Sequence, residues 1–327
     1  MKIYMFGSCR IEQPLTFLQN KNIVSGVTRE SLANVYNTKQ IIQHIDKEHK
    51  VKNIEKIKKN KSMLSFFFPL NNLKYETSSL ENERSKIFNK DIELYIIEIS
   101  SLKNIMYENL ALGTSIEADI KYYFGIDFSY IKNTKPPRKL NYNIENIILL
   151  SKTAKLISKN FNKINKNNIK NNIKKKYTDN LDYFKDKVNN HFFEFFTNFS
   201  DIIKNCEYCF HTKDSFFQDL DKINSILKKP ILFIPHWNAK DKNGNLLETR
   251  IKLNDWLKEY CNKNNHHFLN HENILNNYNY DTLFNKYSET QFFEKDRYGI
   301  YDINHLSEKG VNLFSKSLEK YIHNIKS

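Results

Sequence analysis

The chain opens with Met1-Lys-Ile-Tyr-Met-Phe-Gly-Ser-Cys-Arg10, an apolar run that passes directly into small residues. The run Ile3 to Phe6 predicts a short buried strand, and Gly7-Ser8-Cys9 predicts a tight turn that opens a helix. Such a turn presents a nucleophilic side chain at the carboxyl edge of a sheet, where backbone N–H groups can stabilise an oxyanion. The opening stretch therefore indicates an α/β sheet whose chemistry lies at one edge.

Further strands and helices alternate along the chain. Strands are predicted at Leu94–Ile99, Ile231–Ile234 and His267–Leu269, with another at Asn22–Ser25. Apolar residues at helical spacing predict helices at Thr38–Ile45, Phe216–Leu227, Ile251–Tyr260 and Leu306–Ile325. Because short buried strands separated by helices pair in parallel, the pattern predicts a layered α/β sheet.

The spacing of these strands is uneven. The gap from Ile99 to Ile231 is several times what one βαβ crossover needs, and it contains Phe/Tyr-rich and Lys/Asn-rich segments. Pro136-Pro137 within it indicates a turn or loop. We expect residues 1–327 to form a single α/β domain in which residues 105–205 are a mostly helical insertion or cap.

Composition limits the class of protein. The chain has 327 residues, of which 40% are hydrophobic, so it can bury a substantial core. It contains no apolar run near the ~20 residues that a transmembrane helix needs, and its first residues do not resemble a secretory signal. Four cysteines fit a reducing compartment better than a disulfide scaffold. We expect a soluble, cytoplasmic protein.

The formal net charge is +14, and much of it is concentrated in one stretch. Between Lys152 and Lys176 there are nine lysines and no acidic residue. A solvated basic face is the ordinary interpretation of such a run. The alternative is a binding surface for an anionic polymer or an anionic membrane.

A second motif lies near the carboxyl end: Asp302-Ile-Asn-His305-Leu-Ser-Glu-Lys-Gly310. A turn can bring Asp302 and His305 to one side, so that the carboxylate accepts from one imidazole nitrogen. The other nitrogen can then take a proton from a nucleophile, which is the arrangement that acyl transfer requires. The structural alternative is a helix cap and a surface histidine.

The strand followed by Phe6-Gly7-Ser8-Cys9, together with Asp302-x-x-His305, Leu306-Ser307 and Gly310, resembles the SGNH/GDSL hydrolase superfamily. The resemblance covers both ends of the chain and its central strands. It implies a three-layer, flavodoxin-like parallel sheet. It also implies an activity among those of the superfamily, which includes esterases, lipases, deacetylases and some acetyltransferases.

The opening block departs from the superfamily pattern, which usually reads Phe-Gly-Asp-Ser. Aligned without a gap, Ser8 falls on the aspartate and Cys9 falls on the nucleophilic serine. We rank Cys9 ahead of Ser8 because a thiolate is the stronger nucleophile and needs less help from His305. A helix N-terminus and a cation such as Arg10 would lower the pKa of the Cys9 thiol.

The superfamily also uses a glycine and an asparagine as oxyanion donors, and neither is clear in this sequence. The resemblance makes Gly26 a candidate for the glycine. Ser100, Ser101 or Asn104, which follow the Leu94–Ile99 strand, could donate in place of the asparagine. Glu98, near the end of the same strand, is either a buried structural acid or a site residue.

Polar residues also follow the Ile231 strand, as Pro235-His236-Trp237-Asn238. At the carboxyl edge of the sheet, His236 and Asn238 could line a pocket and Trp237 could offer a flat face to a sugar ring. The alternative is a loop anchored by a buried tryptophan.

The spacing Cys206-x-x-Cys209-x-His211 resembles part of a zinc site, but the chain has no second cysteine pair. Ordinary thiols on a strand are therefore the favoured interpretation of Cys206 and Cys209. We expect neither a metal nor a cofactor.

These observations favour an acyl-ester hydrolase or O-acyltransferase that uses a Cys/Ser-His-Asp arrangement on a small-molecule or glycan acyl ester. The alternative is a non-catalytic SGNH-like protein that binds an anionic glycan, nucleic acid or membrane surface through Lys152–Lys176. A flavodoxin-like nucleotide binder is disfavoured, because the chain has only seven glycines and no Gly-rich phosphate loop.

Overall fold

The computed structural model describes residues 1–29, 37–48, 84–107, 110–112, 138–139, 206–286, 298 and 301–326. The chain divides into two compact units. The first unit comprises Met1–His49, Thr77–Leu102 and His211–Ser327, and the second comprises Lys50–Glu76 and Lys103–Phe210. The first unit therefore holds both ends of the chain and every strand that the sequence predicts.

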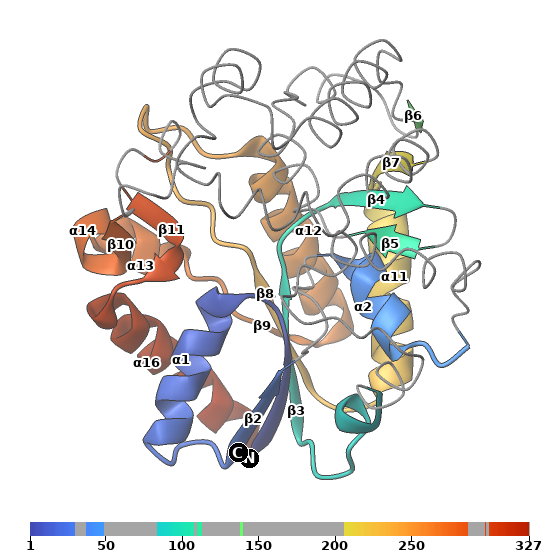
Figure 1. Cartoon of the computed structure of the whole chain (residues 1–327), viewed down its shortest axis with the longest axis horizontal. Coiled ribbons are helices and arrows are strands. Elements are labelled where there is room, and N and C mark those ends of the chain that lie inside the picture. The colour runs from blue at the N-terminus through green and yellow to red at the C-terminus, as the bar shows by residue number, and fades with distance from the viewer. Residues whose placement is uncertain are drawn as a thin grey trace, which may run out of the picture. The chain divides into compact units, whose positions relative to one another are not determined.

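Five parallel strands form the sheet of the first unit (Figure 1). They are β1 (Lys2–Phe6), β2 (Gly26–Arg29), β3 (Leu94–Ile99), β8 (Ile231–Pro235) and β9 (His267–Phe268). Their order across the sheet is β2-β1-β3-β8-β9. This is the strand order of flavodoxin-like sheets, in which ligands bind at the carboxyl ends of the strands, at the switch point between the first and third strands. The predicted α/β fold is confirmed.

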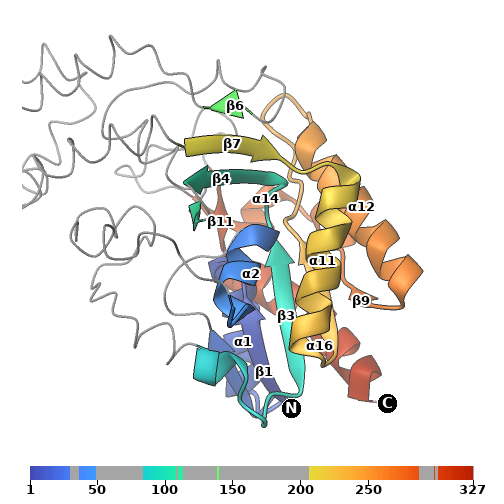
Figure 2. The same cartoon turned by 90° about the vertical axis from the view of Figure 1, so that its right-hand side faces the viewer.

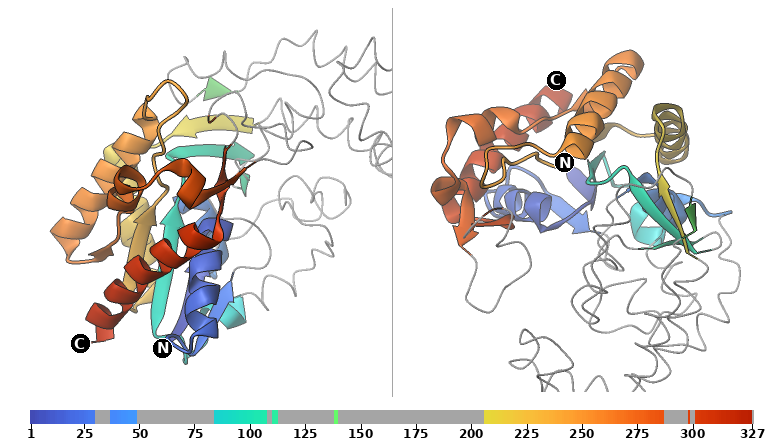
Figure 3. Two further views of the ribbon diagram at one scale, coloured as in Figure 1. Left: turned by 90° about the vertical axis from the view of Figure 1, so that its left-hand side faces the viewer. Right: turned by 90° about the horizontal axis from the view of Figure 1, so that it is seen from above.

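Helices cover both faces of this sheet and complete three layers. Successive side chains of a strand point in opposite directions, so Ile3 of β1 faces one side and Tyr4 faces the other. The Ile3 side packs against α1 (Cys9–Asn20) and α16 (Glu308–Lys326), which lie together in Figure 3. The Tyr4 side packs against α2 (Thr38–Ile45), α11 (Lys213–Leu227) and α12 (Glu248–Asn264), of which α2 and α11 lie toward the viewer in Figure 2.

The two ends of the chain lie against each other. Helix α1 packs along α16, and Ser315 Oγ in α16 donates to the backbone carbonyl of Pro14 in α1 at 3.1 Å. Helix α1 also contacts β11 (Tyr301–Leu306), the strand that precedes α16. The opening and closing sequence motifs therefore belong to neighbouring elements.

Two predicted boundaries are wrong for local reasons. The strand predicted at Asn22–Ser25 begins instead at Gly26, because Asn22 takes a left-handed conformation (φ 59°) in the turn that ends α1. The last helix begins at Glu308 rather than Leu306, because Leu306 is the final residue of β11. Ser307 then caps the helix, and its Oγ accepts from Gly310 N–H at 3.0 Å.

A small hairpin region precedes α16. It consists of α13 (Glu272–Asn277), α14 (Tyr280–Leu283), β10 (Phe284–Lys286) and the antiparallel partner strand β11. Its core contains Trp237, Phe284 and Phe314. A Cβ atom on Gly310 would lie 2.2 Å from the carbonyl oxygen of Leu283, so glycine is needed where α16 meets the end of α14.

The second unit contains an antiparallel sheet in the order β5-β4-β7-β6. Its strands are β4 (Lys103–Tyr107), β5 (Leu110–Leu112), β6 (Arg138–Lys139) and β7 (Cys206–Phe210). The described residues of the interval 105–205 are thus strand residues. Most of that interval lies outside the described residues, as do Pro136-Pro137 and Lys152–Lys176, so its predicted helical character stays a prediction. Within the described ranges, no helix combines the length and the apolar character that crossing a membrane requires.

Candidate active site

The Gly7-Ser8-Cys9 turn connects β1 to α1, as the sequence predicts. Ser8 is the N-cap of α1, with an extended backbone (φ −108°, ψ 177°) and with Oγ accepting from Arg10 N–H at 3.4 Å. Cys9 is the first residue of the helix, and it is half-buried and outside any disulfide. The turn therefore carries a thiol at the N-terminal end of α1, at the carboxyl edge of the sheet.

Glu98 of β3 holds this turn in place. One carboxylate oxygen, Oε2, accepts from both Ser8 N–H at 2.8 Å and Ser8 Oγ–H at 2.6 Å. Ser8 is only 5% exposed, so its hydroxyl proton is committed to a buried carboxylate. Gly7 permits this approach, since a Cβ atom there would lie 2.9 Å from Glu98 Cβ.

Arg10 balances the charge of Glu98. Its Nε donates to Glu98 Oε1 at 2.9 Å, and both side chains are almost fully buried. The same guanidinium donates to Ser100 Oγ at 3.3 Å. Replacing either side chain would leave the other as an uncompensated buried charge, so the stability of the fold requires both Arg10 and Glu98.

Asp302 and His305 form a hydrogen-bonded pair on β11. His305 Nδ1 lies 2.7 Å from Asp302 Oδ2, the Asp302 side chain is buried, and the His305 side chain is 46% exposed. The contact leaves His305 Nε2 on the far side of the ring, where a base would receive a proton. Asp302 is therefore in contact with one imidazole nitrogen, as the sequence motif predicts, and the roles of the two residues in catalysis stay a prediction.

The backbone that makes this pair differs from the expected turn before a helix. Asp302 and His305 both lie within β11, and in a regular strand residues three apart point to opposite faces. The pairing with β10 shifts register here: Asn285 is opposite Asp302, whereas the preceding Phe284 is opposite Leu306. The intervening residues bulge out of the ladder, and this irregularity lets the two side chains meet.

Contacts through Trp237 join the opening turn to β11. The Arg10 guanidinium carbon lies 5.5 Å from the centre of the Trp237 ring, in a cation–π contact. At the edge of the same ring, Trp237 Nε1–H donates to the carbonyl of Ile303, the residue after Asp302, at 3.1 Å. These contacts bring the elements that carry Cys9 and His305 to the same region of the first unit.

His236 directly follows β8, and its backbone N–H donates to the carbonyl of Ile99 at the end of β3, at 2.9 Å. Its Nδ1 donates to the Trp237 carbonyl at 2.8 Å. Burial, with the nearby charges of Arg10 and Arg250, holds the pKa of His236 well below its usual value. His236 is therefore a neutral, buried group at ordinary pH.

Burial changes the interpretation of the next two residues. Trp237 is 3% exposed and packs against Phe284 and Phe314, so its ring cannot serve as an open platform for a sugar. Asn238 closes a loop, because its Oδ1 accepts from Leu247 N–H at 3.0 Å and its Nδ2 donates to the Leu247 carbonyl at 3.2 Å. Both residues anchor the loop, and the expected pocket-lining role is wrong for Trp237.

The candidate oxyanion donors fall in three places. Gly26 starts β2 and pairs with Lys2 at the amino ends of the strands, whereas Ser8 follows the carboxyl end of β1. Gly26 therefore lies at the far end of the sheet from the turn, which removes it from the candidates. Ser100 and Ser101 follow β3 at the carboxyl edge and are half-buried. Asn104 is a buried residue of β4 and belongs to the second unit.

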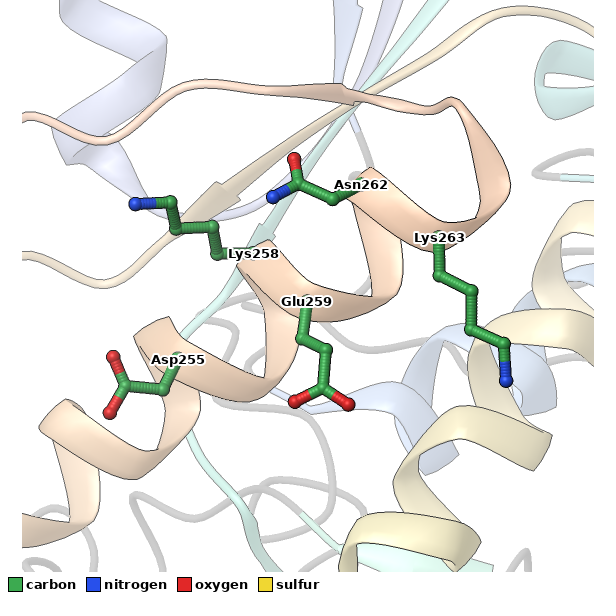
Figure 4. A pocket seen from close by; sticks show the side chains of 5 residues that line it. All are labelled: Asp255, Lys258, Glu259, Asn262 and Lys263. Atoms are coloured by element: carbon green, nitrogen blue, oxygen red, sulfur yellow. The ribbon is translucent and has the colours of Figure 1, made fainter.

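Other candidate sites offer less chemistry. Among the residues that the structure describes, no three His, Cys, Asp or Glu side chains gather so that they could hold a metal ion. A hollow on α12 is lined by exposed side chains of both charges from that one helix (Figure 4): Asp255, Lys258, Glu259, Asn262 and Lys263. It contains neither a thiol nor an imidazole.

Sequence reasoning missed the roles of Glu98 and Arg10. It left Glu98 undecided between a structural and a site role, and it treated Arg10 only as a cation near the thiol. The sequence did carry a signal, because Glu98 is the one charged residue in β3, whose other residues are aliphatic or aromatic. A buried acid requires a partner, and Arg10 is the first cation that follows the neighbouring strand β1 in the sequence.

Comparison with known proteins adds one match. Residues 1–119 match the family model of the TviD N-terminal domain. This stretch includes Ser8, Cys9, Arg10 and Glu98, and it excludes Asp302 and His305. No curated protein and no solved structure matches the chain. The first third of the chain is thus similar to the TviD N-terminal domain.

Proposed function

We propose that this protein is an acyl-transfer enzyme, an O-acyltransferase or acyl-ester hydrolase that acts on a sugar or glycan. In this proposal Cys9 is the nucleophile, His305 is the general base and Asp302 orients the imidazole. The site is SGNH-like in arrangement, with a thiol in place of the usual hydroxyl.

One observation carries the proposal. The Asp302–His305 pair lies on β11, which packs against α1, and α1 begins with Cys9. Ser8 is a poorer candidate nucleophile, because its Oγ donates to Glu98 and also caps the helix. Cys9 is half-buried and therefore more open to a substrate than Ser8.

The chemistry would proceed in two steps. His305 Nε2 takes the Cys9 thiol proton as sulfur attacks the acyl carbonyl, and the oxyanion then collapses. The bond to the leaving alkoxide breaks, the leaving oxygen receives the proton from His305, and the acyl group remains on Cys9 as a thioester. A sugar hydroxyl or water then loses a proton to His305 and attacks the thioester, which returns the thiol.

Charge on the developing oxyanion needs donors near the start of α1. The N-terminal end of this helix carries a partial positive charge that favours an anion. Ser100 and Ser101 follow β3 at the same edge of the sheet and are the candidate hydroxyl donors. Loss of one such donor typically costs about 3 kcal/mol of transition-state stabilisation.

The match to the TviD N-terminal domain supports the substrate class. That domain belongs to a Vi-antigen O-acetyltransferase-type protein, which favours a polysaccharide as acceptor and acetyl as the transferred group. Thioester chemistry suits transfer to a hydroxyl as well as hydrolysis.

The test is covalent labelling of the full chain with p-nitrophenyl acetate, followed by intact-mass and peptide mass spectrometry. We expect one acetyl group on the peptide that contains Cys9. The Cys9→Ala variant should lose it, and the His305→Ala variant should acquire it more slowly. An acetyl group on Ser8 that persists in Cys9→Ala would overturn the assignment of the nucleophile.

A second candidate function is non-catalytic binding of an anionic polymer through Lys152–Lys176. The observation that favours it is the run of nine lysines without an acidic residue. Heparin chromatography of a variant with all nine lysines changed to glutamine keeps the length of the segment. This function predicts elution at much lower salt than the wild-type chain, and unchanged retention would exclude it.

A further inference from the structure

The two halves of the proposed site are joined by buried contacts as well as by helix packing. On the opening side, Glu98 accepts both the N–H and the hydroxyl of Ser8, so β3 fixes the turn immediately before Cys9. Its second oxygen accepts from Arg10 Nε at 2.9 Å. One carboxylate therefore accepts from the residue before Cys9, which is Ser8, and from the residue after it, which is Arg10.

The closing half is reached through Trp237. The Arg10 guanidinium packs on its ring, while the indole N–H donates to the Ile303 carbonyl. Ile303 directly follows Asp302 in the bulged part of β11. Phe284 and Phe314 pack around the indole ring, so Trp237 has little freedom to shift.

We infer that Glu98, Arg10 and Trp237 are positioning residues, which fix the Cys9 turn relative to the Asp302–His305 pair. The inference rests on the proposed function, in which His305 must reach the Cys9 thiol. Proton transfer depends strongly on geometry, and a displacement of about 1 Å can cost roughly a hundredfold in rate. The contacts from Glu98 through Arg10 and Trp237 to Ile303 form a buried link between the two halves.

The charged groups that the structure records at the start of α1 and around Trp237 include Glu12 in the first turn of the helix, the Arg10–Glu98 pair and the Asp302–His305 pair on β11. Arg250 belongs with them, because its guanidinium donates to the Trp237 carbonyl at 3.0 Å. His305→Ala changes none of the other groups, so a shifted profile in that variant reports on the imidazole.

The experiment measures the rate at which iodoacetamide alkylates Cys9 as a function of pH, with the site followed by peptide mass spectrometry. We expect His305→Ala to slow alkylation about tenfold at neutral pH, the effect of raising the half-maximal pH by about one unit. Trp237→Phe keeps an aromatic ring but removes the N–H donor to Ile303. It should shift the profile in the same direction by at least half as much.

Tyr95→Phe is the matched control. It also removes one aromatic donor to a backbone carbonyl, the 2.7 Å bond from Tyr95 Oη to Ile87, but it does so away from the site. We expect the wild-type alkylation profile for this variant. If Trp237→Phe does not fold, Arg10→Lys decides, because lysine keeps the charge beside Glu98 without the planar group over the indole.

The outcomes separate the two proposals. A wild-type profile in His305→Ala would mean that the imidazole does not act on the thiol, and the proposed function would fail. A shifted profile in His305→Ala with a wild-type profile in folded Trp237→Phe or Arg10→Lys would overturn the positioning role alone.

Discussion

The opening turn and the closing strand carry the two halves of the proposed chemistry, and they are built differently. The opening turn is part of a five-stranded sheet, and Ser8, Arg10 and Glu98 around it are each 5% exposed or less. The closing pair lies on a two-stranded hairpin, and the His305 side chain is 46% exposed.

The difference assigns separate tasks to the two regions. The thiol is presented by a backbone turn that a buried ion pair fixes, so its position tolerates little change. The imidazole lies on an irregular strand that is fixed through Asp302, the Trp237–Ile303 hydrogen bond and the packing of α16. Substitutions in the first region should mainly cost stability, whereas those in the second should also alter how the base meets the nucleophile.

The largest effect is expected from Glu98→Ala. It leaves Arg10 as an uncompensated buried cation and removes the acceptor for two donors of Ser8. We expect a loss of about 3–5 kcal/mol in the free energy of unfolding, measured by urea denaturation.

Glu93→Ala is the control for Glu98→Ala. Glu93 also accepts from a β1 backbone N–H, that of Lys2, but its side chain is 57% exposed. Its removal should cost less than about 1 kcal/mol. Equal losses for the two variants would mean that burial does not distinguish the opening turn.

The second-largest effect is expected from acid, which should destabilise the packing around Trp237 and Phe314 in the closing region. His271 lies against Phe314 and near Trp237, and burial lowers its pKa to about 3. In the described part of the chain, neither ring nitrogen has a hydrogen-bond partner. Since the unfolded chain binds a proton near the usual histidine pKa and the folded chain does not, stability is complete above that value and falls as pH drops toward 3.

At about pH 4.5 this residue alone accounts for a loss of roughly 2–3 kcal/mol relative to neutral pH. Urea denaturation across pH measures it. His271→Phe should flatten the curve partly, because His211, whose pKa burial lowers to about 4, contributes in the same direction. A curve unchanged by His271→Phe would contradict the prediction.

A glycine in the closing region should matter more than one at the far edge of the sheet. In Gly310→Ala the new Cβ meets the Leu283 carbonyl oxygen at 2.2 Å, which outweighs the gain of about 1 kcal/mol in helix propensity. We expect a net loss of about 1–3 kcal/mol in urea denaturation. Gly26→Ala, where the nearest atom lies at 3.9 Å, should change stability far less. A stabilised Gly310→Ala would show that α16 is not packed this closely.

Sequence patterns predicted the fold well where burial leaves a regular signature. The strands Leu94–Ile99 and Ile231–Pro235 are buried throughout, so they read as continuous apolar runs. Helix α2 was predicted with its observed bounds because its apolar residues follow the helical period. β11 gave no such signal, because a bulged hairpin strand has no constant alternation.

The site was predictable in its residue types and not in its contacts. The spacing of Asp302 and His305 indicated a pair, and the Gly7-Ser8-Cys9 turn indicated a helix start. The buried partnership of Arg10 with Glu98 joins residues 88 positions apart, and no local pattern specifies it. The burial of Trp237 depends on Phe284 and Phe314 from other elements, so the tryptophan alone could not reveal whether its ring is open.

Apart from the control variants, the smallest stability change is expected from Ser8→Ala, which sharpens the distinction between the two candidate nucleophiles. The variant loses the N-cap of α1 and one donor to Glu98, which should cost about 1–2 kcal/mol in the free energy of unfolding. Thr212→Ala removes the corresponding cap of α11, where Oγ1 accepts from Ser215 N–H at 3.2 Å, and should cost about 1 kcal/mol.

Acylation separates the two roles of Ser8. If Cys9 is the nucleophile, Ser8→Ala still acquires an acetyl group from p-nitrophenyl acetate below its unfolding transition, at a rate reduced because the turn is less firmly held. If Ser8 is the nucleophile, acetylation stops although the protein stays folded. Thr212→Ala should react at the wild-type rate, since its cap lies on the other face of the sheet from α1. Reaction in Ser8→Ala therefore assigns Ser8 to the support of the turn and leaves the thiol as the group that attacks.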